Sequence, residues 1–320
     1  VKEHGMTDHD LPASPDEAPA LAAAKLTIKL NQAERAGDAA KPTLWGEREP
    51  TDRSFPVPHH DARIVPGVAG WRIAGVSRRG KLHAHEGKYR EDAWEAALSA
   101  GQQWQIVAVA DGGGAYPLAR VGAHCVVESV IRTLVSTLPT HVFMPDKITD
   151  VLVGALDQAY LDLDERAHTI ARERPGTTSR DLSTTLLVIA HCPSEQLVCV
   201  AQVGDGLLAL QKGNQELVKL AEADSGAVAG TTVFLNNITK RDWRRRIKQY
   251  KLIETPLFIT AMTDGVADDV LETPNNFPIL FRALSEYTRR QQSEMDLLAW
   301  LDYEKRGSFD DRTLVVIYQP

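Results

Sequence analysis

Hydrophobic and polar residues are distributed differently on the two sides of residue 66. Residues 1–66 are rich in Ala, Pro, Asp, Glu and His and poor in aromatic and β-branched residues, and five prolines fall between Pro42 and Pro66. Proline fixes its own φ angle and removes a backbone donor, so this stretch is expected to be irregular or extended. We therefore predict an N-terminal arm over residues 1–66, partly disordered or docked on the rest, and a folded domain over residues 67–320.

Beyond residue 66, short apolar segments typical of strands occur together with longer segments that have apolar residues at helical spacing. The predicted strands are Trp71–Ser77, Trp104–Ala110, Ser183–His191, Gln196–Gly204, Leu207–Lys212, Pro256–Thr263 and Arg312–Tyr318. The predicted helices are Leu118–Leu138, Lys147–Arg174 and Asn276–Trp300. Strands occur in runs with helices between the runs, which favours an α+β fold of antiparallel sheets over a parallel sheet built from βαβ units.

Composition and charge argue against several classes of function. The chain has 320 residues, of which 43% are hydrophobic and 25% charged, so it can bury a sizeable core. Its 43 acidic residues outnumber its 36 basic residues, which argues against a nucleic-acid binder. No segment approaches the roughly 18 apolar residues of a membrane span, and the three cysteines lack the spacing of a zinc site. We expect a cytoplasmic protein with no nucleic-acid or membrane partner.

The repeated chemical feature is an aspartate placed where an apolar strand ends or begins. Asp111, Asp205 and Asp264 each follow such a strand, and each precedes a glycine. Asp310 lies just before the last strand, and Asp92 lies between the first two. Carboxylates at strand ends can meet at one edge of a sheet, where they would repel one another strongly without cations. A single Asp-Gly pair is usually only a turn, but the whole set predicts a site for hard divalent cations.

These residues and their neighbours resemble the motifs of the PPM/PP2C family of metal-dependent Ser/Thr phosphatases, in a bacterial branch of the family. The matching segments are Arg90–Ala93, Val109–Gly114, Ser183–Leu186, Gln202–Gly206, Thr263–Asp268 and Asp310–Thr313. Each motif alone is weak, but the whole series stands in the family's order and approximate spacing. The resemblance implies a four-layer αββα sandwich, in which two antiparallel sheets are flanked by helices.

The resemblance also implies which oxygens hold metal. Asp111 would bridge two ions, Mg²⁺ or Mn²⁺, and the carbonyl of Gly112 would bind one of them. The other ion would be bound by Asp264 and Asp310. Positions that hold a third, weaker metal in related bacterial enzymes are matched by Asp205 and Asp268.

Two further carboxylates, Glu91 and Asp92, would act mainly through metal-bound water, so Asp92 is counted with the metal site as well. The implied reaction is direct attack of metal-bound hydroxide on the phosphorus of phosphoserine or phosphothreonine. With Arg90 as a candidate for gripping phosphate, the catalytic candidates are Asp92, Glu91 and Arg90.

Two positions depart from the family's pattern. Gly113 stands where the family often has a His that is proposed to protonate the leaving group, and a metal-bound water would have to serve instead. Gly87 lies near the place of the family's phosphate-binding Arg. A nearby guanidinium would have to take over that task, and the candidates are Arg90, Arg79 and Arg78.

These departures leave three functions open. The first is a monomeric enzyme that dephosphorylates proteins modified by a Ser/Thr kinase. The second is a pseudophosphatase that binds phosphoproteins without turnover. The third is a hydrolase of a small phosphate ester. Separately, the basic run Lys240–Lys248 is either a solvated surface or a site that recruits an acidic or phosphorylated partner.

Overall fold

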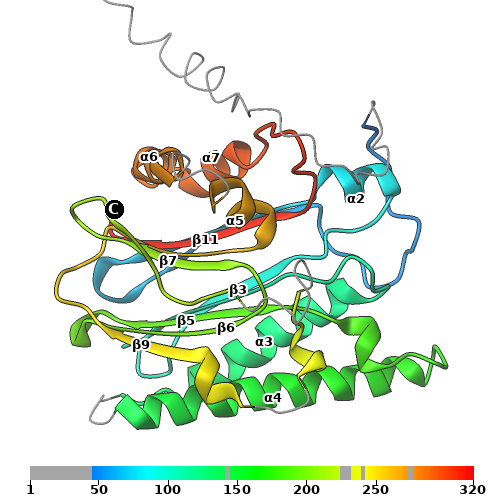
Figure 1. Cartoon of the computed structure of the whole chain (residues 1–320), viewed down its shortest axis with the longest axis horizontal. Helices are drawn as coiled ribbons and strands as arrows, with labels where there is room; N and C mark the ends of the chain where they lie inside the picture. Colours follow the sequence, from blue (N-terminus) through cyan, green and yellow to red (C-terminus); the bar gives the residue numbers. More distant parts are fainter. Residues whose placement is uncertain (1–44, 141–144, 224–231, 239–241, 272–276) are drawn as a thin grey trace, which may run out of the picture.

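Two antiparallel sheets pack face to face, and helices cover the outer face of each sheet (Figure 1). The structure is a computed structural model that describes residues 45–140, 145–223, 232–238, 242–271 and 277–320. The αββα sandwich predicted from the sequence is confirmed.

Neighbouring strands in both sheets are antiparallel. The six-stranded sheet has the order β1-β2-β11-β10-β7-β8, and the five-stranded sheet has the order β3-β4-β5-β6-β9. The strands of the first sheet are β1 (His60–Pro66), β2 (Arg72–Arg78), β7 (Leu207–Gln211), β8 (Leu217–Lys219), β10 (Phe258–Met262) and β11 (Arg312–Tyr318). Those of the second are β3 (Ala93–Leu98), β4 (Gln105–Ala110), β5 (Leu186–Cys192), β6 (Leu197–Val203) and β9 (Ile247–Lys251).

Helices lie on both sides of the sandwich. The five-stranded sheet is covered by α3 (Ala119–Thr137) and α4 (Pro145–Ala171). The six-stranded sheet is covered by α5 (Asp264–Leu271), α6 (Phe277–Tyr287) and α7 (Ser293–Trp300), while α2 (Lys81–Glu86) follows β2. Short 3-10 turns are η1 (Val68–Gly70), η2 (Ser179–Leu182), η3 (Pro193–Glu195), η4 (Leu235–Asn237) and η5 (Trp243–Arg246). Among the described residues, no helix is both long and apolar enough to cross a bilayer.

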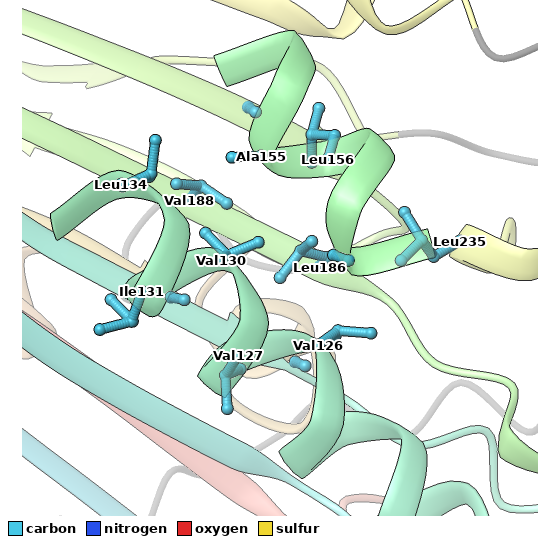
Figure 2. Packing of buried hydrophobic residues seen from close by; sticks show 14 of the residues in the cluster. Val126, Val127, Val130, Ile131, Leu134, Ala155, Leu156, Leu186, Val188 and Leu235 are labelled. Carbon is cyan, nitrogen blue, oxygen red and sulfur yellow. The ribbon is translucent and has the colours of Figure 1, made fainter. Parts of the chain in front are cut away.

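Three apolar clusters hold the layers together. In the first, Val130 of α3 and Leu156 of α4 pack with Leu186 of β5 (Figure 2). Leu187, which points to the other face of β5, belongs to the cluster between the sheets. The third cluster joins α5, α6 and α7 to the outer face of the six-stranded sheet. All of β5 is buried, because both faces of its sheet are covered, and such strands are apolar throughout rather than alternating.

The domain boundary predicted after residue 66 lies too late. Residues His60–Pro66 form β1, which pairs with β2 along its whole length. This strand is at the edge of its sheet, where a proline at the end of a strand is tolerated. The prolines before residue 66 therefore do not exclude a strand.

The segment before β1 is docked on the domain. Arg120 of α3 donates hydrogen bonds to Asp52 Oδ2 at 2.7 Å and to the carbonyl of Ser54 at 2.9 Å. The ring of Trp45 lies 4.5 Å from that of Phe309. Of the two states predicted for the arm, docking therefore describes residues 45–59, while residues 1–44 lie outside the described part of the chain.

Several other features differ from the sequence predictions, including strands β8 and β9, which were not predicted. The predicted helix Asn276–Trp300 is divided into α6 and α7, because the polar run Thr288–Gln292 interrupts the apolar stripe. Strand β3 was missed because its Ala and Glu residues have low strand propensity. In the basic run, Trp243 is buried and donates from Nε1 to Asp157 Oδ1 at 2.7 Å, so this tryptophan anchors the fold rather than a partner.

Replacing each of two helical glycines by alanine is expected to change the stability of the fold in opposite directions. A Cβ on Gly122 of α3 would lie 2.0 Å from the carbonyl oxygen of Leu182, whereas one on Gly154 of α4 would meet nothing within 4 Å. We expect Gly154→Ala to raise the free energy of unfolding by about 1 kcal/mol, and Gly122→Ala to lower it by about 2 kcal/mol. Urea denaturation of both variants measures this, and equal effects would contradict the packing described here.

Candidate active site

Most of the predicted metal-binding aspartates lie at element ends, whereas Asp268 lies within α5. Asp111 follows β4, Asp264 is the first residue of α5 directly after β10, and Asp310 precedes β11. Asp92 immediately precedes β3, and Asp205 lies in the turn between β6 and β7. The rigid, buried strands therefore act as mounts for carboxylates that sit where the backbone leaves the sheets.

The central carboxylates lie close enough for their charges to act on one another, although the described residues whose ligand atoms meet within 4.8 Å are His83, Asp310 and Asp311. Burial raises the pKa of Asp111 well above its usual range, and the negative charges of Asp264, Asp92 and Asp310 raise it further. Burial, followed by the charges of Asp310 and Asp205, does the same to the pKa of Asp264. Asp111 and Asp264 are half-buried and Asp310 is exposed, so the group is open to solvent. Crowded oxygen donors that repel one another are the arrangement that divalent cations stabilise, so this donor set fits such ions.

Backbone hydrogen bonds fix the loop that carries Asp111. Its N–H donates to Thr185 Oγ1 at 2.9 Å, and its carbonyl accepts from the Thr184 hydroxyl at 2.9 Å and from the Thr185 N–H at 2.8 Å. Next to it, a Cβ on Gly112 would lie 2.8 Å from the carbonyl carbon of Ala119 and 2.9 Å from the carbonyl oxygen of Glu91. The motifs around Asp111 and Thr184 therefore form one structural unit, in which only glycine fits at position 112.

Asp92 is buried beneath this group and held by hydroxyls. Its Oδ2 accepts from Thr263 Oγ1 at 2.8 Å and from Thr313 Oγ1 at 2.6 Å. The hydroxyl of Ser77 lies 2.6 Å from that of Thr313, which extends the network. Burial and the charge of Asp311 raise the pKa of Asp92 to about 7. Its carboxyl also hydrogen-bonds that of Asp111, so the two carboxyl groups are directly connected.

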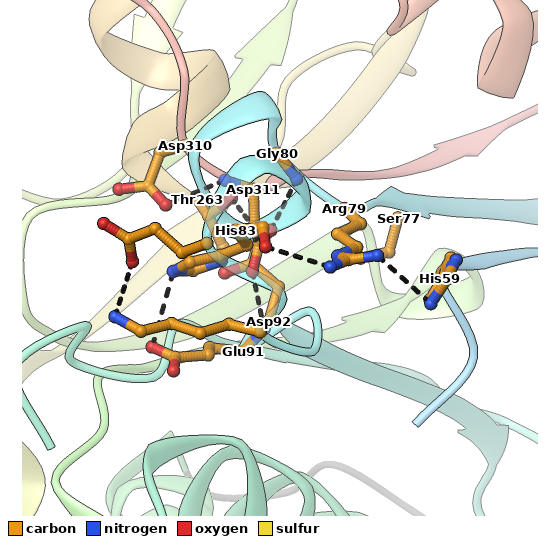
Figure 3. Close-up of polar contacts among 12 residues, drawn as sticks. His59, Ser77, Arg79, Gly80, His83, Glu91, Asp92, Thr263, Asp310 and Asp311 are labelled. Carbon is orange, nitrogen blue, oxygen red and sulfur yellow. Dashed lines mark hydrogen bonds and ion pairs between the residues drawn. The ribbon is translucent and has the colours of Figure 1, made fainter. Parts of the chain in front are cut away.

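Asp311 is held by two backbone donors and a histidine (Figure 3). Oδ1 accepts from the Gly80 N–H at 2.6 Å, and Oδ2 accepts from the Glu91 N–H at 2.5 Å. His83 Nδ1 lies 3.0 Å from Oδ1. Burial opposes ionisation, but the His83 imidazole and the backbone donors hold the pKa of Asp311 below its usual value. Asp311, His83 and Asp310 bring ligand atoms within 4.8 Å of one another, yet the oxygens of Asp311 are already used by protein donors.

Glu91 lies at the other side of His83. Its side chain is buried, and burial raises its pKa to about 7. Among the described residues, no donor hydrogen-bonds Glu91 Oε2, while His83 Nε2 lies 3.8 Å from it. A Cβ on Gly114 would lie 3.7 Å from the same oxygen, so this carboxylate borders the loop after Asp111.

The three arginines considered for phosphate binding are buried or paired, although Nε and Nη1 of the buried Arg90 have no hydrogen-bond partner among the described residues. Arg90 is only 1% exposed. Arg79 donates to the carbonyls of Arg48 and His83, at 2.8 Å and 2.9 Å. The guanidinium of Arg78 lies 2.8 Å from a carboxylate oxygen, that of Asp302. In this conformation Arg90 has no surface with which to contact a phosphate, and Arg79 serves to attach the docked segment.

The candidate third site has some of the required features. Asp205 is half-buried, and its Oδ2 accepts from the Thr232 hydroxyl at 2.6 Å. Its Oδ1 is buried without a hydrogen-bond partner among the described residues. The charges of Asp205 and Asp268 both raise the pKa of Asp264. An oxygen left without a donor beside other carboxylates is suited to a cation.

The sequence did not single out the residues that support the carboxylates. Thr263 and Thr313 lie inside recognised motifs, but only their contact with Asp92 reveals their task. From its sequence position near the site, His83 could either contact substrate or be a loop residue, and the structure places it on α2. Nothing in the spacing of His83 marks it as a partner of Asp311, since the two are 228 positions apart in the sequence and meet only in the fold.

Solved structures of other proteins share this fold. The chain resembles the crystal structure of a bacterial serine phosphatase with an Arg-to-Lys substitution, with a TM-score of 0.57, 16% identity, and coverage of 78% of this chain and 97% of that one. For the serine/threonine phosphatase Stp1 from Staphylococcus aureus, the TM-score is 0.55 at 14% identity, over 81% and 98% of the two chains. For PppA from Pseudomonas aeruginosa it is 0.52 at 15% identity, over 78% and 98%.

These solved structures share the fold, and comparison of the sequence with family models identifies a family. No curated protein matches the chain. The family model described as protein phosphatase 2C matches residues 79–302, which include the motifs around Asp111 and Asp264. The chain therefore belongs to the protein phosphatase 2C family and is a metal-dependent protein serine/threonine phosphatase.

Proposed function

We propose that the chain removes phosphate from phosphoserine and phosphothreonine in proteins at a pair of Mg²⁺ or Mn²⁺ ions. Asp111 and the Gly112 carbonyl would hold one ion, and Asp111, Asp264 and Asp310 the other. The observation that carries this proposal is the mutual repulsion of Asp111, Asp264 and Asp310 at a solvent-open site. When bound, such ions make water more acidic and neutralise charge on the phosphoryl oxygens.

The neighbouring carboxylates would support this site without holding both ions. Asp92, fixed by Thr263 and Thr313, would orient the carboxyl of Asp111 and accept a proton from water at the site. Glu91 would accept a hydrogen bond from water on the other side of the loop. We extend the proposal to a third, weaker cation, for which the oxygens come from Asp205 and Asp268.

The surroundings of the enzyme are also part of the proposal. We infer a phosphoprotein substrate made by a Ser/Thr kinase, a monomeric chain and a cytoplasmic location. The acidic composition and the bacterial phosphatases with the same fold support this view. RsbX, whose crystal structure contains magnesium, shares the fold with a TM-score of 0.50 at 12% identity and supports magnesium as one candidate ion.

A second candidate function is a phosphoprotein-binding module without turnover. One observation favours it, namely that Arg78, Arg79 and Arg90 are buried or occupied by other partners. A phosphothreonine peptide and a small aryl phosphate should be assayed with Mn²⁺ and with a chelator. Turnover of the peptide that is lost with chelator supports the proposal, turnover of the aryl phosphate alone favours a small-ester hydrolase, and binding without turnover favours the module.

Metal binding is expected to stabilise the folded chain. Cations that bind only the folded protein relieve the repulsion around Asp111 and Asp264. At a free Mn²⁺ concentration of one hundred times the dissociation constant, the free energy of unfolding should rise by about 2.7 kcal/mol. Urea denaturation in Mn²⁺ and in chelator measures the difference. Identical midpoints in the two conditions would contradict a metal site in the folded protein.

A further inference from the structure

His83 is buried between two carboxylates that face opposite nitrogens of its ring. Nδ1 lies 3.0 Å from Asp311 Oδ1, and Nε2 lies 3.8 Å from Glu91 Oε2. The exposed fractions of the three side chains are 4%, 2% and 5% in the order His83, Asp311 and Glu91. A buried imidazole in this position has few alternative orientations, so its two nitrogens have defined partners.

The contact with Asp311 anchors the ring. Asp311 also accepts the N–H groups of Gly80 and Glu91, so its carboxylate is fixed to the backbone on both sides of α2. Burial opposes a charge on His83, but Asp311 raises the pKa of His83 to about 9, which makes both ring nitrogens donors near neutral pH. Nδ1 is in ion-pair contact with Asp311 without the geometry of a hydrogen bond, and Nε2 lies on the side of Glu91 at 3.8 Å.

The contact between His83 and Glu91 is the one that reaches the proposed metal site. Glu91 Oε2 has no hydrogen-bond partner among the described residues, and His83 Nε2 faces it at 3.8 Å. A buried carboxylate oxygen without a donor is costly, so a small movement that brings the two atoms into hydrogen-bond distance would be favourable. The same oxygen borders Gly114, in the loop that begins with Asp111. A donor at His83 Nε2 therefore determines how the Glu91 carboxylate is directed toward the metal-binding loop.

The backbone of α2 is held firmly enough for this task. The His83 carbonyl accepts from Arg79 Nη2 and from the Lys88 N–H, both at 2.9 Å. The helix is further fixed where the Leu82 N–H donates to the carbonyl of Phe309 at 2.9 Å. A residue that orients a second residue must itself be held in a fixed position, and these backbone hydrogen bonds hold His83 in this way.

We propose that His83 is a positioning residue of the phosphatase reaction: Asp311 orients its ring, and Nε2–H directs the Glu91 carboxylate toward the metal-binding loop. This inference rests on the proposed function of the site. Residues that orient groups around a metal typically contribute about 10- to 100-fold to activity or metal affinity when they are replaced.

Two near-isosteric variants distinguish the roles of the two ring nitrogens of His83. Asn places an amide donor near the position of Nδ1 and retains the contact with Asp311, whereas Gln places one near Nε2 and retains the contact with Glu91. We expect His83→Asn to lower kcat about tenfold with KM within twofold of wild type. His83→Gln should keep kcat within about threefold of wild type. Manganese affinity, measured by calorimetry without substrate, should be unchanged in both variants.

Two controls test whether the effect passes through Glu91. In a Glu91→Gln background, His83→Asn should lower kcat by less than about twofold, because the group that it positions has been removed. His85→Asn is the matched control on the same helix, since His85 accepts from the Gly46 N–H and contacts Trp45 away from both carboxylates. This variant should keep the wild-type kcat.

Several outcomes would overturn the inference. Equal kcat for His83→Asn and wild type, or equal losses in the Asn and Gln variants that follow their losses of stability, would make His83 a purely structural residue. A loss of manganese affinity in both variants would make it a metal ligand with Asp310 instead. A wild-type chain without Mn²⁺-dependent turnover would overturn both this inference and the proposed function, whereas the other outcomes overturn only the role of His83.

Discussion

Asp264→Asn is expected to lower kcat/KM for a phosphothreonine peptide by at least about 10³-fold, which corresponds to about 4 kcal/mol of lost transition-state stabilisation. In the proposed site, Asp264 supplies an oxygen to one of the two metal ions. The negative charge of Asp310 acts on its carboxylate. A metal centre contributes several kcal/mol by neutralising charge on the transferring group, so loss of one charged ligand should remove most of the rate. Asn preserves the polar first residue of α5, since both side chains suit a helix N-terminus.

The same substitution should stabilise the protein in the absence of metal. Burial and neighbouring carboxylates raise the pKa of Asp264 in the folded state above its usual 3.8. The unfolded chain therefore releases this proton at lower pH, and the folded state loses stability as pH rises above 3.8 toward the folded pKa. Asn cannot ionise and avoids this loss. Urea denaturation in chelator should show little advantage for the variant at pH 4 and a clear advantage at pH 7.5.

A surface carboxylate provides the control for Asp264. Asp164 lies on α4, is half-exposed, and forms an ion pair with His168 of the same helix at 3.4 Å. Asp164→Asn should therefore change neither turnover nor the pH dependence of stability by a measurable amount. If Asp264→Asn kept Mn²⁺-dependent turnover within tenfold of wild type, the assignment of Asp264 as a metal ligand would be wrong.

The features that the sequence predicted well are local. Strand β4 and the following Asp111 are contiguous, as are strand β10 and Asp264, so apolar patterning placed each carboxylate at a strand end without knowledge of the fold. The sandwich followed from the alternation of strand runs and helices. What the patterning could not supply was the convergence of these ends, which required the resemblance to a known family.

The features that the sequence did not predict depend on contacts between distant segments. Thr313 is 221 positions from Asp92, and the apolar-polar pattern of β11 gives no reason to single it out. Arg90 was a reasonable candidate for phosphate because charged residues are usually exposed, and only the fold shows that it is buried. Likewise, β1 contains several polar residues and ends in a proline, and its pairing with β2 defines it as a strand.

Gly265→Ala is expected to have the second large effect, because position 265 joins the two segments that carry Asp264 and Asp310. A Cβ on Gly265 would lie 2.0 Å from the carbonyl oxygen of Asp311 and 3.1 Å from its carbonyl carbon. Both atoms belong to the backbone, so the start of α5 or the segment before β11 must move. We expect the free energy of unfolding to fall by about 3 kcal/mol, as for a severely overpacked site.

The activity of Gly265→Ala should fall further than its stability explains. The Thr263 N–H donates to the Thr313 carbonyl at 3.1 Å, so a shift that separates the two segments also moves Asp264 relative to Asp310. A displacement of about 1 Å in a catalytic group commonly costs about 100-fold in rate. The measurement is kcat at a temperature where the variant is folded by circular dichroism, with Gly154→Ala as the glycine control. A folded Gly265→Ala variant with wild-type kcat would show that the two segments are not rigidly coupled, and that α5 can move without disturbing the carboxylates.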